Sequence, residues 1–313
     1  MKKIGLWMYT NEGGYLIREK IVDKLHKEGY EVIYDFDMRE CYIMNGCVYT
    51  KNHINLSDIE VLFYMNADER NEYQHNILRF LELSGVRLIN SFNSYNNAMD
   101  KASTNMILSK NGINTPPCIL VNKNPSIDII EKIFNEWGSA VLKKRIGGGG
   151  EGILKFESYQ NFRDFIGYID NKCITDFYLE KYIDFDWSDC RVEFFEDKII
   201  TVYGRKNNKS FKTNVHQGGD MIPINEKDEY IKIATQAKNI LGLDTTIVDM
   251  IKCKTDGKIY VLEVNELMGI FYESYYKYLT LNNIEHAEII SEVKNDNKKI
   301  NYIIEKIKKV VEG

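Results

Sequence analysis

Short apolar runs alternate with segments of helical spacing in the first part of the chain, and this alternation restricts the fold more than any other feature. Helices are predicted over residues 15–27 and 74–84, where apolar residues recur at helical spacing. Strands are predicted around them, over residues 3–9, 30–34, 61–65 and 86–89. A chain that alternates in this way forms a parallel sheet covered by helices. Residues 1–93 are therefore expected to form one α/β lobe.

The remaining chain is richer in strands and indicates two further lobes. Helices are expected over residues 94–111, 126–137, 162–169, 226–241 and 286–311. Strands are expected over residues 118–121, 140–144, 153–156, 177–183, 190–195, 198–205, 246–253 and 258–264, the last two as a hairpin around Thr255–Gly257. Because 313 residues are too many for one small core, we expect a central lobe over 94–183 and a C-terminal lobe over 184–313. The predicted fold class is α/β (α+β).

The composition excludes several classes of protein. Hydrophobic residues make up 44% and charged residues 28% of the chain, which is typical of a folded protein and excludes bulk disorder. The net charge of −5 argues against a nucleic-acid partner held by general electrostatics. No apolar run approaches the roughly 18–20 residues of a membrane span, so no membrane partner is expected.

The N-terminus and the cysteines predict a cytoplasmic protein. Met1–Tyr9 starts basic and lacks a long apolar stretch and a small-residue cleavage site, so we expect a first strand and not a signal peptide. The 6 cysteines are scattered without Cys-x-x-Cys spacing, which favours free thiols in a reducing compartment over a disulfide framework. None of the 5 histidines sits in a Cys/His ligand pattern, so zinc is not expected.

A glycine cluster at residues 147–152 is the sharpest local feature. Gly147, Gly149 and Gly152 match G-x-G-x-x-G, but a predicted strand follows where a dinucleotide-binding fingerprint needs a helix. A Walker loop is excluded because no Gly-Lys-Ser/Thr follows. The glycines are therefore predicted to form a hairpin tip, whose backbone N–H groups can cover phosphates as a flexible lid. The alternative is a mobile loop in solvent.

Two lysines precede this cluster on opposite faces of a predicted strand. Lys143 and Lys144 are neighbours in sequence, so one of them can point inward at a phosphate. The alternative is that both are surface residues.

Asp249, Glu263 and Asn265 lie inside apolar strands of the predicted C-terminal hairpin. Glu263 and Asn265 are two positions apart and share a sheet face, and Asp249 can join them if the two strands pair. Two carboxylates and an amide oxygen suit Mg²⁺, which takes few protein ligands and completes its shell with water and phosphate. The alternative is that the sheet is half exposed and these polar side chains simply face water, in alternation with apolar residues that face the core.

Arg191 and Arg205 lie on predicted neighbouring strands in a chain whose basic residues are mostly Lys. Arginine is the preferred two-point reader of phosphate and carboxylate groups. For either arginine alone, a surface salt bridge is the alternative.

In this order along the chain, these residues resemble the ATP-grasp superfamily, and most closely its RimK-like carboxylate–amine ligases. Asn96–Lys101 looks like the family's helix start, and Leu179–Ile183 is similar to the hinge that hydrogen-bonds adenine. Asp189 and Arg191 match the family's Asp-x-Arg, and Phe211–Gly219 is similar to its FRSNxxxGG strand and turn. The resemblance covers most of the chain. It implies an N-terminal parallel α/β lobe, a small central nucleotide lobe and a C-terminal lobe with a mixed sheet.

The resemblance also implies the roles of individual residues. Mg²⁺, or Mn²⁺ in its place, is expected at Asp249, Glu263 and Asn265. Arg191 and Arg205 are expected to steady the charges of the transferred phosphate and the oxyanion. The residues implied to bind ATP are Lys101, Lys143, Gly147, Gly148, Gly149, Gly150, Glu180, Lys181, Tyr182, Ile183, Asp189, Lys212, Thr213 and Asn214.

One segment and two single residues depart from the family pattern. After the last expected metal ligand, many relatives read Asn-Ala-Ser-Pro-Gly, whereas this chain reads Asn265-Glu266-Leu267-Met268-Gly269. Because this segment borders the acceptor site in relatives, the departure bears on the acceptor substrate. Lys212 stands where relatives often have Arg, and Lys181 where many have Glu.

The activity implied by the resemblance is ATP-dependent ligation. A carboxylate is activated as an acyl phosphate and joined to the amine of an amino acid, a peptide or a carrier-bound acceptor, with release of ADP and phosphate. A kinase that stops at phosphoryl transfer is the alternative, and a nucleotide-binding regulator is argued against by the intact expected ligands. The N-terminal lobe and residues 266–285 are expected to choose the substrates, and a homo-oligomer is left open.

Two segments are candidates for that choice. Residues 64–75 form a polar turn after a buried strand. This turn either recognises an amino acid or the end of a peptide, or is a polar loop that leads into a helix. Phe271–Tyr278 is rich in tyrosine and is expected to be a packed amphipathic surface more often than a recognition segment.

Overall fold

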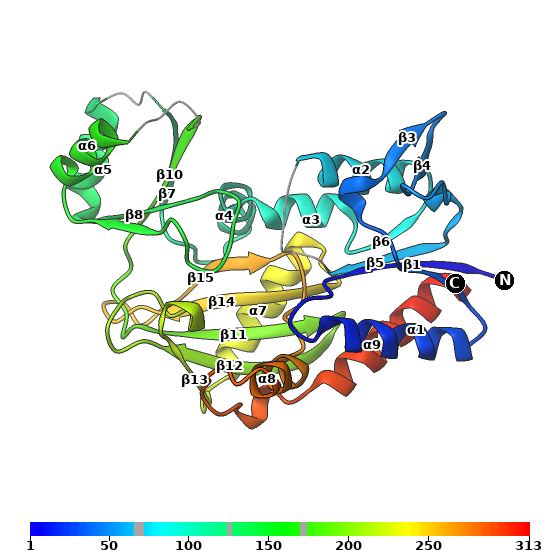
Figure 1. Ribbon diagram of the computed structural model, residues 1–313. Helices are drawn as coiled ribbons and strands as arrows, with labels where there is room; N and C mark the ends of the chain where they lie inside the picture. Colours follow the sequence, from blue (N-terminus) through cyan, green and yellow to red (C-terminus); the bar gives the residue numbers. More distant parts are fainter. Residues whose placement is uncertain (66–71, 124–126, 170–173) are drawn as a thin grey trace.

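The computed structural model describes residues 1–65, 72–123, 127–169 and 174–313 of the chain (Figure 1). Its N-terminal sheet is parallel, as predicted, with the order β2–β1–β5–β6. Its strands are β1 (Lys3–Met8), β2 (Glu31–Ile33), β5 (Val61–Met65) and β6 (Arg87–Ile89), with helices α1 (Gly14–Lys27) and α2 (Glu72–Leu83) beside them. The inward residues of these strands are almost entirely apolar, which is typical of a parallel sheet covered on both faces.

The C-terminal helix α9 (Asp296–Glu312) completes the core of the N-terminal sheet (Figure 1). Ile300, Ile303 and Ile307 are buried against residues of α1, β1 and β5. The prediction of a helix from residue 286 was wrong at its start, because Asn295 adopts a non-helical conformation directly before α9. Asparagine competes for backbone hydrogen bonds and favours helix ends over helix interiors.

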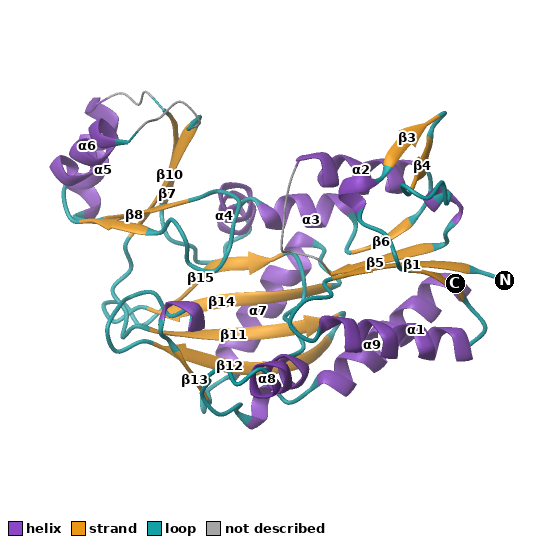
Figure 2. Cartoon of the chain, in the orientation of Figure 1, coloured by secondary structure: helices purple, strands orange, loops and turns teal. Residues whose placement is uncertain are grey.

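The central sheet is antiparallel and has the order β7–β10–β8–β9. It consists of β7 (Cys118–Asn122), β8 (Ala140–Lys143), β9 (Leu154–Phe156) and β10 (Asp176–Lys181), with helices α5 (Ile127–Trp137) and α6 (Tyr159–Tyr168) packed beside it (Figure 2). Phe134, Phe156, Phe162 and Phe177 form the centre of its core. Strands β8 and β9 pair across the glycine cluster, so the predicted hairpin tip is confirmed.

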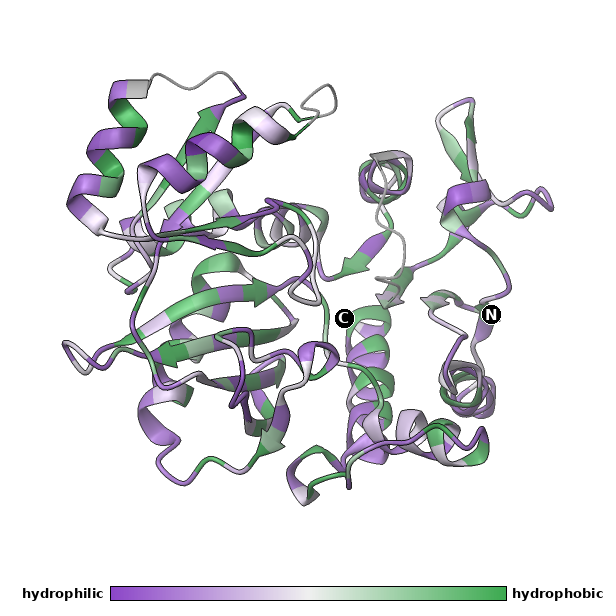
Figure 3. Ribbon diagram, turned by 60° about the vertical axis from the view of Figure 1, so that its left-hand side comes forward, coloured by the Kyte–Doolittle hydropathy of each residue, from purple (hydrophilic) through white to green (hydrophobic). Residues whose placement is uncertain are grey.

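The C-terminal sheet has the order β13–β12–β11–β14–β15 and is antiparallel throughout, not mixed as the resemblance implied, because it is built around the hairpins β11–β12 and β14–β15. Its strands are β11 (Ser188–Phe195), β12 (Lys198–Lys206), β13 (Asp220–Ile222), β14 (Thr245–Lys252) and β15 (Ile259–Asn265). One face packs against α7 (Asp228–Leu241) and α4 (Lys101–Lys110) through an apolar core that includes Val192, Val248 and Ala234. The helices carry both hydrophobic and hydrophilic residues, as expected of helices that pack on one side only (Figure 3).

The expectation of one helix over residues 94–111 was wrong. The structure has α3 (Phe92–Met99) and α4, separated at Asp100, whose backbone is extended. The Asp100 side chain accepts a hydrogen bond from the backbone N–H of Ala102 and so caps α4. The break places Lys101 at the very start of a helix, which matters for the site described below.

Several short elements were not predicted. They are the hairpin of β3 (Tyr42–Met44) and β4 (Cys47–Tyr49), strand β13, helix α8 (Tyr272–Leu281) and the 3₁₀ turns Met38–Glu40, Leu56–Asp58, Val215–Gln217 and Ser291–Val293. Tyr272 and Tyr276 of α8 are buried, so the tyrosine-rich segment is largely packed, as expected.

Asn90 joins the N-terminal sheet to the C-terminal sheet. Its side chain is fully buried, donates to the carbonyl oxygens of Thr245 and Glu266, and accepts from the backbone N–H groups of Asp244 and Thr245. No helix within the described residues is long and apolar enough to cross a bilayer. Cys41, Cys47, Cys118, Cys190 and Cys253 are free thiols, and Cys173 lies outside the described residues.

Candidate active site

A row of polar side chains crosses the C-terminal sheet on the face opposite its apolar core. Strand register places Tyr203, Arg191, Asp249 and Glu263 directly opposite one another on β12, β11, β14 and β15. Directly opposed residues of antiparallel strands share a face. Two strand pairs that are distant from each other in the sequence, β11–β12 and β14–β15, thus bring a tyrosine, an arginine and two carboxylates into one line.

Both carboxylates in this row are paired with cations. Arg191 Nε lies 2.7 Å from Asp249 Oδ1, and Arg205 Nη2 lies 3.1 Å from Asp249 Oδ2. Lys101 Nζ lies 2.8 Å from Glu263 Oε1. Burial lowers the pKa of the Arg191 guanidinium, but the Asp249 carboxylate outweighs this effect and leaves that pKa well above its usual value. Arg191 therefore keeps its positive charge at neutral pH.

Asp189 fixes Arg205 from the other side. Its Oδ1 accepts from the backbone N–H and from Nε of Arg205, both at 3.1 Å. Its Oδ2 lies 2.5 Å from Arg205 Nη2 and 2.5 Å from the hydroxyl of Thr213, which donates to it. Asp189 and Arg205 are both buried. Arg205 therefore bridges two carboxylates, and its planar fork suits this geometry in a way that lysine does not.

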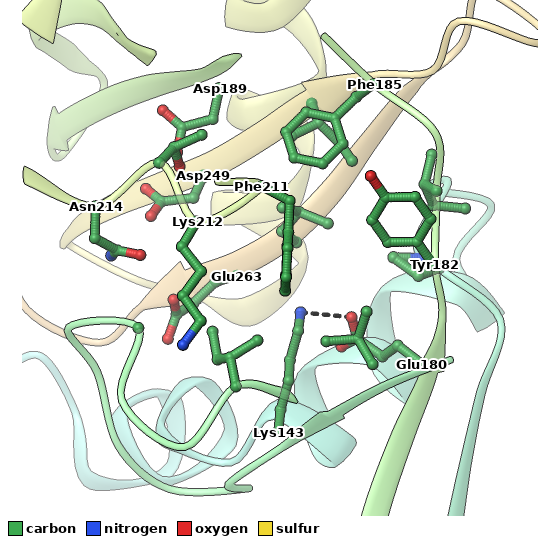
Figure 4. A pocket seen from close by; sticks show the side chains of 18 of the residues that line it. Lys143, Glu180, Tyr182, Phe185, Asp189, Phe211, Lys212, Asn214, Asp249 and Glu263 are labelled. Carbon is green, nitrogen blue, oxygen red and sulfur yellow. Dashed lines mark hydrogen bonds and ion pairs between the residues drawn. The ribbon is translucent and has the colours of Figure 1, made fainter. Parts of the chain in front are cut away.

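A cavity lies between this polar face and the central sheet (Figure 4). Its walls come from β8, the hinge after β10, the strands of the C-terminal sheet and the segment 211–214. Tyr182, Phe185 and Phe211 line one part of it, and the rings of Tyr182 and Phe211 meet edge to face at 6.0 Å. Charged residues line the other part. Such a division suits a ligand with a flat apolar end and an anionic end.

Lys143 points into the cavity from β8. Its Nζ lies 2.5 Å from Glu180 Oε2, and both side chains are nearly buried (Figure 4). The other oxygen of Glu180 accepts from the hydroxyl of Tyr178 at 2.8 Å. Lys144 instead packs along Gly152. Of the two lysines considered from sequence, Lys143 is thus the one that faces the cavity.

The glycine hairpin tip reaches the edge of the cavity. Gly147, Gly149, Gly150 and Gly152 have positive φ, a conformation that favours glycine. A Cβ on Gly150 would lie 2.5 Å from Asn214 Oδ1, so only glycine fits at this contact. Lys101 Nζ donates to the carbonyl oxygen of Gly147 at 2.6 Å. Lys101 therefore joins the tip to the carboxylate of Glu263.

A second, smaller cavity lies where β1 and β5 end. It is lined by Tyr9, Asn11, Glu12, Met65, Leu267, Met268, Ile270 and Tyr275. The ends of parallel strands are the usual binding edge of an α/β sheet. Leu267, Met268 and Ile270 follow β15, so this cavity adjoins the strand that carries Glu263 and Asn265. Residues 66–71 of the predicted polar turn lie outside the described residues.

Comparison with known proteins identifies the family. A model of the RimK-like ATP-grasp domain matches residues 98–291, which is more than half of the chain. The chain belongs to the RimK-like ATP-grasp family. The tetrahydromethanopterin:α-L-glutamate ligase of Methanocaldococcus jannaschii is 28% identical over 216 residues, which cover 67% of this chain and 72% of that protein.

Solved structures support the same fold. The D-alanine–D-alanine ligase of Bacillus anthracis complexed with ATP is 19% identical, with a TM-score of 0.65 and 99% of each chain covered. An ATP-grasp ligase of Chryseobacterium gregarium, in complex with ADP and a leader and core peptide, is 17% identical, with a TM-score of 0.63 and coverage of 98% of this chain and 96% of that one. The predicted ATP-grasp fold and RimK-like resemblance are confirmed, and so is the predicted class of ATP-dependent carboxylate–amine ligase.

The structure brings most of the residues implied by the ATP-grasp resemblance to the first cavity. Those that line it are Lys101, Lys143, Gly150, Glu180, Lys181, Tyr182, Ile183, Asp189, Arg205, Lys212, Thr213, Asn214, Asp249 and Glu263. Five others do not line it, namely Gly147, Gly148, Gly149, Arg191 and Asn265. The glycines belong to the hairpin tip, and Arg191 reaches the site through Asp249.

Sequence reasoning missed the apolar lining of this ATP-grasp cavity. Pro116, Val141, Ile153, Phe185, Ile251 and Leu262 line it in addition. Apolar residues in strands carry no signal that separates a ligand wall from a core. Only their alternation with the charged positions Lys143, Asp249 and Glu263 could have indicated them.

The residues expected to bind a metal fit a hard cation. Asp249 and Glu263 are opposite each other in register, and Asn265 lies on the same face one pair further. The Asn265 amide nitrogen donates to the Ile247 carbonyl at 3.2 Å, which leaves the amide oxygen as the atom for a cation. No cluster of three or more His, Cys, Asp or Glu side chains suited to a metal occurs among the described residues. Two carboxylates and an amide oxygen form a set that Mg²⁺ accepts when phosphate supplies further oxygens.

Proposed function

We propose that this chain binds ATP in the first cavity and uses it to join a carboxylate to an amine. The supporting observation is the charged cluster of Arg191, Arg205 and Lys101 around the carboxylates of Asp249 and Glu263. With Asp189, which also binds Arg205, three cations stand against three carboxylates, so the cluster is a network of alternating charges held in place by ion pairs. Cationic groups that hydrogen bonds fix in a partly closed cavity stabilise a transferring phosphoryl group.

The residues divide the binding of ATP between them. Tyr182, Phe185 and Phe211 take the adenine, and Lys101, Lys143 and the glycine tip take the phosphates. Asp249, Glu263 and Asn265 would hold Mg²⁺, which would supply neutralising charge to the phosphate oxygens. When ATP binds, Lys143 exchanges its contact with Glu180 for one with a phosphate oxygen. The Glu180 carboxylate is then free to accept a hydrogen bond from the adenine.

The reaction takes place in two balanced steps. A carboxylate oxygen attacks the γ-phosphorus, the bond to ADP breaks, and an acyl phosphate forms. The amine nitrogen then attacks the acyl carbon, phosphate leaves with the bonding electron pair, and the amine loses a proton. Arg205 lines the cavity and steadies the negative charge on the phosphoryl group, while Arg191 holds Asp249 in place. The glycine tip excludes water, which would hydrolyse the acyl phosphate.

The second cavity is the place for the amine substrate in this proposal. It adjoins the end of β15, and Glu12 is the one residue with a full charge among the eight that line it. A carboxylate suits an ammonium group, and the apolar lining of Met65, Leu267 and Met268 suits an uncharged part of the same molecule. The relative from Methanocaldococcus jannaschii is named as an α-L-glutamate ligase, so L-glutamate is the first amine to test. The peptide bound to the Chryseobacterium gregarium ligase makes a peptide substrate the second.

Release of ADP tests the function and separates a ligase from a kinase. The purified protein is incubated with MgATP and with amino acids and short peptides, first singly and then in pairs. A ligase releases ADP only with a carboxylate and an amine together, and the product mass equals their sum less one water. ADP release with a single partner and a phosphorylated product would establish the kinase instead. ATP binding without turnover for any partner would establish a regulator.

The three-lobe boundaries at residues 93 and 183, the cytoplasmic location and homo-oligomerisation stay predictions. The lobe boundaries can be tested by limited proteolysis, with cleavage expected near those residues and not within the three sheets.

A further inference from the structure

A buried ion pair outside the ATP cavity connects the C-terminal sheet to the C-terminal helix. Glu193 of β11 and Lys299 of α9 are both fully buried, with Lys299 Nζ 2.7 Å from Glu193 Oε1. A buried pair of this kind contributes little net stability, because desolvation of the two charges offsets their attraction. Replacement of such a pair by apolar side chains is often neutral or stabilising. Stability alone therefore gives no reason for this pair.

The pair holds the backbone of a two-residue segment. Glu193 Oε1 also accepts from the backbone N–H of Gly269 at 2.8 Å. Lys299 Nζ donates to the carbonyl oxygens of Gly269 at 3.0 Å and of Ile270 at 2.9 Å. A Cβ on Gly269 would lie 2.8 Å from Ile247 Cδ1 and 3.1 Å from Glu193 Oε1, so the segment packs closely against β14 and β11.

This segment forms part of the wall of the second cavity. Ile270 lines that cavity together with Leu267 and Met268 just before it. Glu193 itself stands opposite Ile247, which in turn stands opposite Asn265. Glu193 therefore stands in the same row of the sheet as Asn265, and the ion pair contacts the segment that lines the second cavity.

Two further observations indicate that Glu193 and Lys299 position the 269–270 segment. Glu193 Oε2 is buried and has no hydrogen-bond partner among the residues that the structure describes, so the carboxylate is not arranged for maximal stability. Lys299 lies on α9, whose neighbours Ile300, Ile303 and Ile307 belong to the core of the N-terminal sheet. A contact made by Lys299 thus fixes the 269–270 segment relative to the strand ends that form the opposite wall of the cavity.

We propose that Glu193 and Lys299 are positioning residues for the amine substrate. They fix the Gly269–Ile270 backbone, so that the second cavity keeps its shape next to the end of β15. This inference rests on the proposed function, because it takes the second cavity as the amine site. A displacement of about 1 Å in such a wall costs up to roughly a hundredfold in rate through lost orientation.

Three variants and one control test the proposal. Lys299→Met and Glu193→Leu each leave one buried charge, and the double variant removes both charges. Lys306→Met is the control, because Lys306 lies on the same helix and pairs with Glu196 at 3.0 Å and Asp244 at 2.8 Å, away from the second cavity. The measurements are the melting temperature, the Kd for MgADP, and KM and kcat for the amine that supports ADP release, with L-glutamate tested first.

The double variant decides between positioning and stability. We expect its melting temperature to be close to that of the wild type, while KM for the amine stays raised by roughly tenfold or more and the Kd for MgADP is unchanged. Lys306→Met is expected to lower the melting temperature without raising that KM. Recovery of KM together with the melting temperature in the double variant would overturn the proposal.

Hydrogen exchange gives a readout that needs no substrate. Backbone amides of residues 267–271 are expected to exchange faster in Lys299→Met and in the double variant, and at the wild-type rate in Lys306→Met. Unchanged exchange in the double variant would also overturn the proposal. If no amine supports turnover by the wild type, the proposed function fails, whereas the exchange experiment still reports whether the pair fixes this segment.

Discussion

The two cavities of this protein differ in how their walls are built. The first is lined by charged side chains in strand register, with Arg205 held by Asp189 and Asp249 and with Glu263 held by Lys101. The second is lined mainly by apolar side chains and tyrosines from strand ends and from the segment after β15. The first wall is fixed by hydrogen bonds between side chains, and the second by packing and by the backbone contacts of residues 269–270.

This difference indicates a division of labour. Phosphoryl transfer needs preorganised charge at defined positions, and strand register supplies such positions with little freedom. Substrate choice needs a shape that can change between relatives, and loop segments supply it. Variants of the first cavity should therefore change turnover, and variants of the second should change KM for the amine.

Replacement of Arg205 by lysine should give the largest effect. The charge is kept, but lysine cannot bond to Asp189 and Asp249 at once as the guanidinium does. We expect a loss of roughly 2–4 kcal/mol in the transition state, about 30- to 1000-fold in kcat, with the Kd for MgADP nearly unchanged. Steady-state kinetics and calorimetric titration with MgADP measure the two quantities.

Arg191→Lys serves as the companion variant to Arg205→Lys. Arg191 does not line the cavity and contacts Asp249 and the hydroxyl of Tyr203, so a smaller loss of kcat is expected. Normal turnover by both folded variants would remove the arginines from the mechanism. A rise in KM for the amine at constant kcat would contradict the division between the cavities.

Replacement of Glu263 by glutamine should cut turnover by roughly tenfold or more, because it removes a charged metal ligand. The fold should stay intact, since Glu263 is only partly buried and the amide keeps its size. Asp256→Asn is a matched control at the turn of the same hairpin, where Asp256 is away from both cavities. Turnover and its dependence on Mg²⁺ concentration are measured. Near-wild-type turnover by Glu263→Gln would remove Glu263 from the metal site.

Many residues of the first cavity could be predicted because the chemistry of the site requires residue types that stand out in the sequence. Asp249, Glu263 and Asn265 interrupt apolar strands, and a charged residue inside such a strand must face a polar surface. Glycines at positive φ, such as Gly150 beside Asn214, also stand out as a cluster. The strand order that aligns Arg191 with Asp249 could not be predicted, since it depends on which distant strands pair.

The individual residues of the second cavity were harder to predict than its location. Residues 64–75 and 266–285 were expected to choose the substrates, and both segments contribute to this cavity, but none of its lining residues was assigned a role. Leu267 and Met268 look like core residues, and Lys299 looks like one more lysine in a lysine-rich helix. The break at Asp100 was missed for a similar reason, because aspartate within a helical pattern gives no sign of whether it caps a new helix. Only tertiary packing shows that Lys299 is buried and that Asp100 ends one helix and begins another.

Replacement of Gly149 by valine tests the hairpin tip. Gly149 has a φ of 70°, which costs a β-branched residue about 1–2 kcal/mol, so we expect kcat to fall by roughly five- to thirtyfold. Gly148→Val adds the same bulk at a neighbour without positive φ and measures the cost of bulk alone. Equal losses in the two variants would show that bulk, and not backbone conformation, limits closure of the tip.

Replacement of Glu12 by glutamine should give the smallest effect and tests the second cavity alone. Glu12 is exposed, and an exposed ion pair with an ammonium group contributes about 0.2–1 kcal/mol. We therefore expect KM for the amine to rise by roughly 1.5- to fivefold, while kcat and the Kd for MgADP stay at wild-type values. The rise should shrink at high salt, because salt screens exposed charges. Glu19→Gln is the control, since Glu19 lies on α1 and pairs with Arg18 instead of lining the cavity. A change in kcat without a change in KM would mean that Glu12 acts on the phosphoryl chemistry, and the separation of the two cavities would then be wrong.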